Sequence, residues 1–354
     1  MSLPTTMRAL RLHAVRSDAG REQLRVDELP RPDPAPDEVL IEVGACGICA
    51  TDVHVLTGGL PHGPRLPQVL GHEPAGTVAA VGDEVSDWRP GDRVAVLMGR
   101  PCQRCGYCRI GRENLCRDLV VPGIDTAGAL AGYLPVDPDL LVPVPPDVPL
   151  HEAAIVTDAV ATPYHALKRA GVGEGSIVTV VGLGGLGMHA VLLAKLSGAH
   201  VIGIDVDVIN LERAVAWGAD AVIDATREDP VTTVHELTDG GSDRALEFVG
   251  SAETADQALR CVAPGGRAVL VGFGRDHLET LPLARFVTQE LEVAGSYGAT
   301  RQDVGELFDL LEDGRLDLGR SVTDTTDLDG APAALRALET REGHPIRTVV
   351  TDLR

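Results

Sequence analysis

The stretch SIVTVVGLGGLGMHAVLLAKLSGAHVIGID, residues 176–205, decides the fold class of this chain. Residues 177–181 form an apolar run that predicts a β-strand, and a helical pattern of apolar residues follows at about 186–197. A second apolar run at 201–204 predicts another strand. Strand, glycine turn, helix and strand in this order predict a βαβ unit of the kind that binds a dinucleotide.

The turn between the first strand and the helix carries the pattern G-x-G-x-x-G. Glycines there allow a tight turn and let the backbone and the helix N-terminus approach a pyrophosphate. An acidic residue at the end of the second strand binds the ribose hydroxyls and repels a 2'-phosphate. Because no Arg or Lys stands in residues 206–210, the sequence predicts NAD rather than NADP. The predicted cofactor-binding residues of this unit are Gly182, Gly184, Gly185, Leu186, Gly187 and Asp205.

The alternation of predicted strands and helices continues after residue 205. Further apolar runs separated by helix-like segments and Gly/Pro punctuation give six candidate strands, the number that a doubly wound parallel sheet requires. The sequence before residue 150 is rich in Pro and Gly and predicts short strands in a β-rich lobe. The four further runs are 221–223, 245–249, 268–271 and 291–294, and the helix-like segments are 211–217 and 252–262.

The length of the chain indicates its number of domains, and its net charge limits the classes of partner that it can bind. The chain has 354 residues, more than the roughly 250–300 at which one core stops growing, so we expect two domains. A net charge of -21 argues against a nucleic-acid partner, because phosphate backbones attract a basic face. Residues 1–12 lack the apolar core of a signal peptide, and the apolar stretch 177–196 suits an α/β core better than a membrane span. We expect a cytoplasmic protein that acts on a small molecule without a membrane partner.

Four cysteines form a cluster with the spacing C-x2-C-x2-C-x7-C. In a reducing cytoplasm such a cluster is more often a metal site than a set of disulfides. The spacing favours the closed four-thiolate coordination of a structural zinc over an iron–sulfur cluster, whose bacterial pattern has three residues and a proline around its last cysteine. An incidental or redox-active cluster remains the alternative. The four predicted ligands are Cys102, Cys105, Cys108 and Cys116.

A second candidate site lies upstream, in GACGICATDVHVLTG (44–58) and VLGHEPAGTV (69–78). Cys49 and His72 each follow a β-like run, at 39–43 and 67–70. A thiolate and an imidazole are suitable ligands for a catalytic zinc, which needs a third protein ligand and one open position. Taken singly these residues are weak signals, because a lone Cys is usually a small buried hydrophobe.

Taken in order, these motifs resemble the zinc-dependent medium-chain alcohol dehydrogenases of the medium-chain dehydrogenase/reductase superfamily. The resemblance runs over essentially the whole chain. It implies an α/β protein with a GroES-like β-rich catalytic domain at 1–155, a structural-zinc lobe at about 100–117, and an NAD-binding Rossmann domain at 156–297. Residues 298–354 would return to the catalytic domain, and the active site would lie in the cleft between the domains.

The resemblance also implies roles for individual residues. Cys49 and His72 match catalytic zinc ligands, and Glu73 matches a nearby carboxylate that ligates or exchanges at the metal. Thr51 matches the hydroxyl that passes on the substrate proton, and His54 the imidazole at the outer end of that relay, although a surface histidine after a turn is the plainer interpretation. Cys46 is expected to be structural. Arg347, in IRTVV, matches an arginine that contacts the cofactor pyrophosphate.

The third zinc ligand departs from the pattern of many relatives, which carry a cysteine there. The segment IVTDAVATPYHAL (155–167) offers Asp158 instead, where polyol and threonine dehydrogenases of the family have a glutamate. A carboxylate is an acceptable zinc ligand. The alternative is that Asp158 is a helix N-cap and Glu73 completes the shell.

The implied activity is reversible, NAD-linked oxidation of a primary or secondary alcohol, cyclic or allylic, with two zinc ions per chain. Zinc would lower the pKa of the alcohol, and hydride would pass to the nicotinamide. Polyol or amino-alcohol oxidation, reduction of an aldehyde or enone, and a non-enzymatic NAD sensor are the alternatives. Pairing near 291–294 would give a homo-oligomer, a tetramer rather than a dimer. The predicted pocket residues are Met98, Leu56, Leu60 and Tyr297.

Overall fold

The computed structural model describes residues 3–16, 23–59, 63–278 and 281–354. The chain forms two compact units, each with its own sheets. Unit 1 comprises Met1–Asp158 and Ala299–Arg354, and unit 2 comprises Ala159–Gly298. The chain therefore leaves unit 1 after Asp158 and returns at Ala299. The family resemblance implies domain boundaries at 156 and 298.

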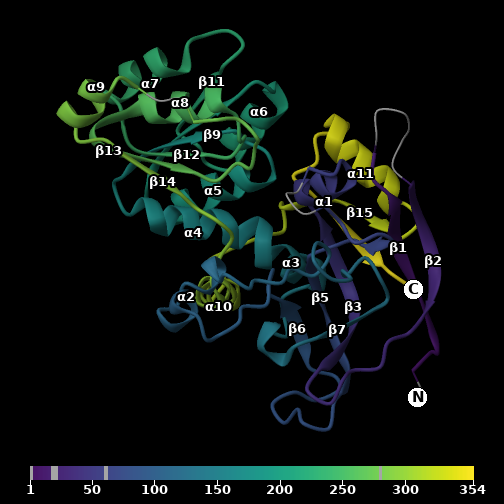
Figure 1. The fold of residues 1–354 in the computed structure, drawn as a ribbon. Helices are drawn as coiled ribbons and strands as arrows, with labels where there is room; N and C mark the ends of the chain where they lie inside the picture. Colours follow the sequence, from purple (N-terminus) through teal and green to yellow (C-terminus); the bar gives the residue numbers. More distant parts are fainter. Residues whose placement is uncertain (1–2, 17–22, 60–62, 279–280) are drawn as a thin grey trace. The chain divides into compact units, whose positions relative to one another are not determined.

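Unit 2 contains a six-stranded parallel sheet with the order β11-β10-β9-β12-β13-β14 (Figure 1). This is the strand order 3-2-1-4-5-6 of a doubly wound dinucleotide-binding fold. Each of the six predicted apolar runs overlaps one of these strands, so the predicted fold class is confirmed. The strands are β9 (Ile177–Val181), β10 (His200–Asp205), β11 (Ala221–Asp224), β12 (Ser242–Glu247), β13 (Val262–Leu270) and β14 (Glu292–Gly295).

Helices cover both faces of this sheet, with α4 and α5 on one side and α7 and α8 on the other (Figure 1). Their inward side chains join the apolar strands in a core that includes Ile204 and Leu259. The apolar pattern does not predict α7, which begins after Asp229, whose side chain accepts a hydrogen bond from the Thr232 amide. The helices are α4 (Ala161–Ala170), α5 (Gly185–Leu196), α6 (Val208–Ala216), α7 (Pro230–Thr238), α8 (Ala252–Cys261) and α9 (Leu283–Thr288).

Unit 1 is rich in β-structure, as the sequence predicts. Its larger sheet has the order β15-β16-β3-β5-β6-β8, with β7 also paired to β3, and a smaller sheet has the order β2-β1-β4. The strands are β1 (Thr6–Ala14), β2 (Gln23–Pro30), β3 (Val39–Ile48), β4 (Gln68–Val69), β5 (Glu73–Val81), β6 (Arg93–Val96), β7 (Tyr133–Val136), β8 (Leu141–Pro143), β15 (Val322–Asp327) and β16 (Arg347–Asp352).

The helices of unit 1 include two from the returning segment, α10 (Arg301–Glu312) and α11 (Ala331–Thr340). The others are α1 (Ala50–Leu56), α2 (Gly106–Arg109), α3 (Leu150–Ile155) and the short 3-10 turns η1 (Glu113–Leu115) and η2 (Pro138–Leu140). The returning segment also supplies β16, which pairs antiparallel with β3 and sets Thr348 opposite Ile48. The last strand of the chain is thereby fixed beside the end of β3, where α1 begins.

A π-helical turn, η3 (Val156–Val160), joins α3 directly to α4. Asp158 lies in this turn, in the interior of a helical run that extends from residue 150 to 170. The interpretation of Asp158 as a helix N-cap is therefore wrong, because the N-cap of α4 is Val160. Single π-helical turns inside α-helices occur frequently at functional sites.

None of the helices in the described residues has both the length and the apolar character needed to cross a membrane.

Candidate active site and metal centres

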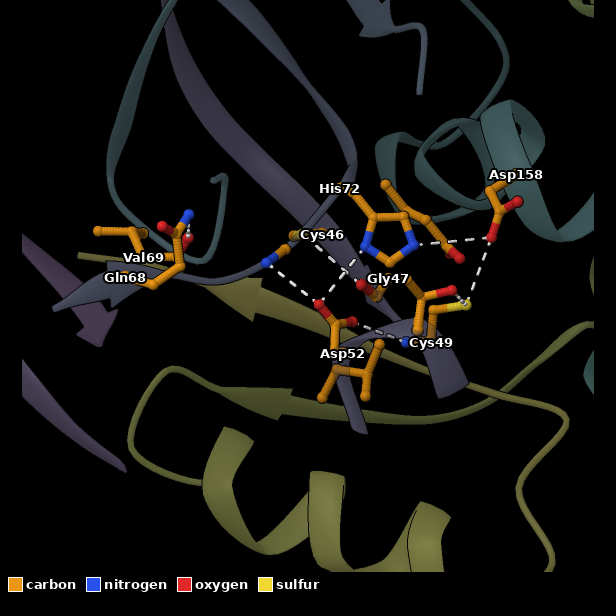
Figure 2. A network of polar contacts seen from close by, with 12 residues as sticks. Cys46, Gly47, Cys49, Asp52, Gln68, Val69, His72 and Asp158 are labelled. Atoms are coloured by element: carbon orange, nitrogen blue, oxygen red, sulfur yellow. Dashed lines mark hydrogen bonds and ion pairs between the residues drawn. The ribbon is translucent and has the colours of Figure 1, made fainter. Parts of the chain in front are cut away.

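A buried cluster in unit 1 brings together four of the predicted site residues. One side-chain donor atom from each of Cys49, His72, Glu73 and Asp158 lies within 4.8 Å of the others. Cys49 Sγ is 3.4 Å from Asp158 Oδ2, and His72 Nε2 is 3.7 Å from the same oxygen (Figure 2). Sulfur, imidazole nitrogen and carboxylate oxygen are the donor types that zinc binds.

Local structure explains how these residues converge. β3 ends at Ile48, and Cys49 is the N-cap of α1, so its side chain stands at a strand-to-helix corner. His72 immediately precedes β5, which pairs with β3 so that Glu73 lies opposite Gly47. Asp158 reaches the cluster from the π-helical turn η3. The cluster therefore needs contacts between three segments that are distant in sequence.

Asp52 belongs to this site although the sequence gives it no role. Its side chain is 1% exposed, and its carboxylate accepts hydrogen bonds from the Cys49 amide at 3.0 Å and the Gly71 amide at 3.3 Å. Its Oδ1 also lies 3.4 Å from His72 Nδ1 (Figure 2). A carboxylate on the far ring nitrogen orients a metal-binding histidine and leaves Nε2 for the metal. The signal in the sequence is an acidic residue three positions after the N-cap.

Charges inside the cluster determine which groups ionise. Burial alone raises the pKa of Asp158, but His72 and Arg347 outweigh burial and hold that pKa far below its usual range. The pKa of Cys49 is also lowered, because Arg347 and His72 outweigh its burial. Burial and the charges of Cys49 and Asp158 raise the pKa of Glu73, and Arg347 offsets only part of that increase. Asp158 is thus the more readily ionised of the two carboxyl groups.

His72 is also strongly affected by its neighbours. Burial lowers its pKa, but the carboxylates of Asp52 and Asp158 outweigh burial and raise the pKa well above its ordinary value. The negative charges of Asp52 and Asp158 therefore favour a positive charge at this point of the cluster. A divalent cation would satisfy the same charges. Both Glu73 carboxylate oxygens are buried and, although Arg347 Nη2 lies 3.0 Å from Oε1, make no hydrogen bond of good geometry within the described residues, as expected of a group beside a metal site. The donor set and these buried carboxylate oxygens fit zinc.

Arg347 lies at the start of β16 and points into this cluster. It is 4% exposed; its Nη2 is 3.0 Å from Glu73 Oε1 and 3.7 Å from Asp158 Oδ2. Its Nη1 donates to the Ile48 carbonyl at 3.3 Å. These contacts of the guanidinium are all with residues of unit 1, so the pyrophosphate contact expected of Arg347 stays a prediction.

The predicted relay residues lie on α1 beside Cys49. The Thr51 hydroxyl is 3.7 Å from Cys49 Sγ. His54 follows three residues later, and residues at this spacing are neighbours on one helix face. Cys46 is fully buried, its thiol contacts the Gly47 carbonyl, and it is not one of the four clustered donors, which agrees with the structural role expected for it.

The second cluster contains the four predicted cysteines of the lobe, whose sulfur atoms also lie within 4.8 Å of one another. Cys105 Sγ is 3.5 Å from Cys108 Sγ, and Cys116 Sγ accepts hydrogen bonds from the amides of Cys102 and Asp118. The backbone N–H of Cys108 lowers the pKa of Cys105 to about 6. Backbone N–H groups that point at sulfur favour thiolates, the form that binds zinc.

The glycine turn of unit 2 has the expected local structure. Gly182 has φ of +85°, a conformation that favours glycine. A Cβ at Gly187 would lie 1.8 Å from the Gly182 carbonyl oxygen, so the close packing of α5 on the turn requires glycine there. Gly184 is the N-cap of α5, which begins with Gly185 and Leu186. The helix N-terminus is thereby presented at the turn, as a pyrophosphate site requires.

Asp205 ends β10 and lies beside the glycine turn. Its Oδ2 accepts a hydrogen bond from the Leu183 amide at 2.6 Å, and its Oδ1 accepts from the amides of Val206 and Asp207. The carboxylate is therefore held in a fixed position at the carboxyl end of the strand, where dinucleotide-binding folds bind a ribose.

A pocket of about 390 Å³ in unit 1 includes Met98, one of the predicted substrate-pocket residues. Thr157, which precedes Asp158, also lines it, together with the polar side chains of Glu113, Asp139 and Arg301. Leu56 is buried, and Leu60 lies outside the described residues. Tyr297 belongs to unit 2 and is half exposed.

Comparison with known proteins adds independent evidence. Residues 35–146 match the family model described as the alcohol dehydrogenase GroES-like domain, and residues 185–313 match that of a zinc-binding dehydrogenase. The chain is 35% identical over 344 residues to a NAD-dependent alcohol dehydrogenase of Sulfurisphaera tokodaii, covering 94% of this chain and 96% of that protein. This chain belongs to the zinc-dependent medium-chain dehydrogenase/reductase family.

Two other members of the family show its range. A sorbitol dehydrogenase of Bacillus subtilis is 33% identical over 347 residues, covering 96% of this chain and 95% of that protein. The structure of a candidate zinc-binding dehydrogenase of Sinorhizobium meliloti bound to NADP has a TM-score of 0.88 and 30% identity, covering 98% of this chain and 100% of that chain. The present chain is thus an oxidoreductase of the alcohol dehydrogenase type that acts on a small molecule.

Proposed function

We propose that the protein is a zinc-dependent, NAD-linked alcohol dehydrogenase that reversibly oxidises a primary or secondary alcohol, cyclic or allylic, to the carbonyl. The convergence of Cys49, His72 and Asp158 on one buried point, with the Thr51 hydroxyl beside the Cys49 sulfur, carries this proposal. A binding module has no need for a buried donor set of this kind next to a hydroxyl, which argues against the sensor alternative.

Two zinc ions per chain are part of the proposal. Cys49, His72 and Asp158 would hold the catalytic ion, and the four cysteines of the lobe would hold the structural one. A bound zinc supplies Lewis-acid polarisation of an alcohol oxygen, and bound NAD supplies the hydride acceptor. Asp52 orients the His72 ring, and Asp158 contributes the second negative charge to the ligand set.

Thr51 and His54 are the proposed proton path. Thr51 can accept a proton from a substrate hydroxyl beside the cluster and donate its own, because a hydroxyl is both donor and acceptor. His54, on the same face of α1, is the next acceptor toward the outside. An imidazole ring nitrogen can accept a proton and pass it on to solvent.

NAD is the proposed cofactor, with the glycine turn 182–187 at its pyrophosphate and Asp205 at its ribose. The fixed carboxylate of Asp205 supports NAD, because it would repel a 2'-phosphate. The NAD dependence of the Sulfurisphaera tokodaii relative points the same way, whereas the Sinorhizobium meliloti structure contains NADP. Replacing Asp205 with Ala should therefore raise activity with NADP relative to NAD.

The substrate is the least constrained part of the proposal. Met98 offers an apolar, adaptable wall that suits a medium-sized alcohol. Polyol or amino-alcohol oxidation is the second candidate, favoured by the carboxylate at 158 and by the similarity to a sorbitol dehydrogenase. Reduction of an aldehyde or enone uses the same residues in the opposite direction.

We also propose a cytoplasmic location and a homo-oligomer, a tetramer rather than a dimer. Free cysteines as zinc ligands suit a reducing compartment. β14 is an edge strand of the six-stranded sheet, so it can pair with a second copy. Light scattering after size-exclusion chromatography measures the assembly directly.

The activity is tested by a screen of cyclic, allylic, linear, polyol and amino alcohols with NAD and with NADP, following the absorbance of the reduced cofactor. The proposal expects NAD-dependent oxidation that is lost when zinc is removed and regained when zinc is restored. Aldehydes and enones are assayed in parallel with NADH. A zinc-loaded protein that is inert toward every substrate in both directions would contradict the proposed activity.

A further inference from the structure

We propose that Arg347 is a positioning residue that keeps the Glu73 carboxylate out of the metal's coordination shell, so that one coordination position stays open for substrate. This inference rests on the proposed metal at the buried cluster. It assigns Arg347 a role in unit 1 that is separate from any contact with a cofactor pyrophosphate.

The register of the larger sheet fixes the two side chains together. Glu73 on β5 lies opposite Gly47 on β3, and Gly47 in turn lies opposite Val349 on β16. Arg347 is two residues before Val349, and side chains two apart in a strand point to the same face. The arginine therefore lies on the same face of the sheet as the glutamate, and Nη2 is 3.0 Å from Oε1.

The contacts of Glu73 hold its carboxylate beside the proposed metal position, over Gly47 and against Arg347. Its Oε2 occupies the space above Gly47, where a Cβ would lie 2.1 Å away. Its Oε1 faces the arginine, yet the carboxylate is close enough to the other donors to become a fourth ligand. Glu73 is fully buried, so water cannot compensate its charge. Arg347 is the cation in direct contact with this carboxylate, at 3.0 Å.

The charges explain why this matters. Cys49, Asp158 and Glu73 are three potential anions around one divalent ion, and the guanidinium contacts all three, with its Nη2 3.7 Å from both the Cys49 sulfur and the Asp158 carboxylate. Removing one partner of a buried ion pair leaves the other charge uncompensated, which is strongly unfavourable. Without Arg347, Glu73 would lose the cation that contacts its carboxylate directly, and a bound metal would attract that carboxylate. A fourth protein ligand would then close the site.

The experiment compares cobalt-substituted wild type with R347Q, E73Q and the double variant E73Q/R347Q, using imidazole as an added ligand. The visible difference spectrum on adding imidazole reports the buried site, because a closed four-thiolate site takes no further ligand. R347Q should bind imidazole at least about tenfold more weakly than wild type, whereas the double variant should return to within about threefold of wild type, the coupling expected of neighbouring charges.

Several results would overturn the inference. The inference is wrong if R347Q binds imidazole as tightly as wild type does. This holds even if R347Q binds NADH more weakly, because Arg347 would then act only on the cofactor. The inference is also wrong if imidazole binds equally weakly to R347Q and to the double variant, because the effect of Arg347 would then not depend on Glu73. If R347Q does not fold, the comparison of E73Q with the double variant tests the inference. The two variants should bind imidazole with equal affinity, and unequal affinities would contradict the inference. A wild type that holds only the lobe metal contradicts the proposed function instead.

Discussion

The two candidate metal-binding clusters of unit 1 differ in donor type, sequence spacing and burial. The lobe cluster has four sulfur donors within 15 residues of sequence, and three of its cysteines are partly exposed. The buried cluster mixes sulfur, nitrogen and oxygen donors that come from positions 49, 72, 73 and 158, and all four residues are buried. A closed set of identical ligands suits a structural ion, whereas a mixed set with a spare carboxylate and a nearby hydroxyl suits chemistry.

The difference has a cause in the surroundings. Backbone N–H groups of the lobe itself point at its sulfur atoms. The buried cluster instead depends on side chains from outside its ligand set, Asp52 on His72 and Arg347 on Glu73. The sulfur atoms of the lobe are therefore positioned by the backbone of the lobe itself. The donors of the buried cluster are positioned by contacts between segments that are distant in sequence.

The largest expected effect is the loss of the buried metal in Asp158→Ala. One of the two zinc ions should be lost, and kcat/KM for alcohol oxidation should fall roughly a thousandfold, because a Lewis acid lowers the activation barrier by several kcal/mol. Elemental analysis and steady-state kinetics measure both. Asp158→Glu is the matched control, which should keep both ions because the carboxylate remains. Retention of both ions by Asp158→Ala would mean that Glu73 completes the shell.

Asp52→Asn tests whether the buried cluster depends on its surroundings. The His72 ring would lose the anionic group at Nδ1, so zinc affinity or kcat should fall about 10–100-fold, the usual effect of removing such a partner. Competition with a chelator of known affinity gives the zinc dissociation constant. The lobe ion should be unaffected. Unchanged affinity and kcat would remove Asp52 from the site.

Cys116→Ser should separate the two clusters in the other direction. The variant should keep the buried ion and a kcat within a few-fold of wild type, but its Tm should fall on the order of 5–10 °C, because a structural zinc stabilises the fold. Differential scanning calorimetry gives the shift. Cys46→Ser is the control, a buried cysteine outside both clusters that should retain both ions. A complete loss of activity in folded Cys116→Ser would show that the lobe is not merely structural.

The smallest effect concerns thiol reactivity in the zinc-free protein. The thiolate is the reactive form, and the pKa of Cys105 is lowered to about 6 at a partly exposed site. Cys105 should therefore react with iodoacetamide at neutral pH, and its rate should decline as the pH falls through about 6 and the thiolate is protonated. Cys49, 5% exposed, should be protected. Peptide mass spectrometry measures both, and faster labelling of Cys49 would contradict the difference in exposure.

The features that the sequence predicts best are local ones. The strand, glycine turn and helix of 177–197 depend on neighbouring residues, and the structure gives β9 the predicted bounds and starts α5 one residue early. The four-cysteine spacing is similarly local, because one short loop delivers every ligand. The sequence indicates Cys49 and His72 only through their motifs, because the contact between them depends on the pairing of β3 with β5.

The features that the sequence does not predict depend on long-range contacts. Arg347 reaches the Ile48 carbonyl across 299 positions of sequence, through the register of β16 on β3. The π-helical turn places Asp158 inside a helix, where the residue pattern allowed a helix start. Asp52 is an acidic residue in a first helical turn, a common position, and only its contact with His72 gives it a role.

Zinc-edge anomalous diffraction from crystals of the zinc-loaded protein tests the central claim most directly. The account predicts two anomalous peaks per chain, one among the sulfur atoms of Cys102, Cys105, Cys108 and Cys116 and one bounded by Cys49, His72 and Asp158. A single peak, in the cysteine lobe, with the buried cluster fully ordered and empty, would contradict it.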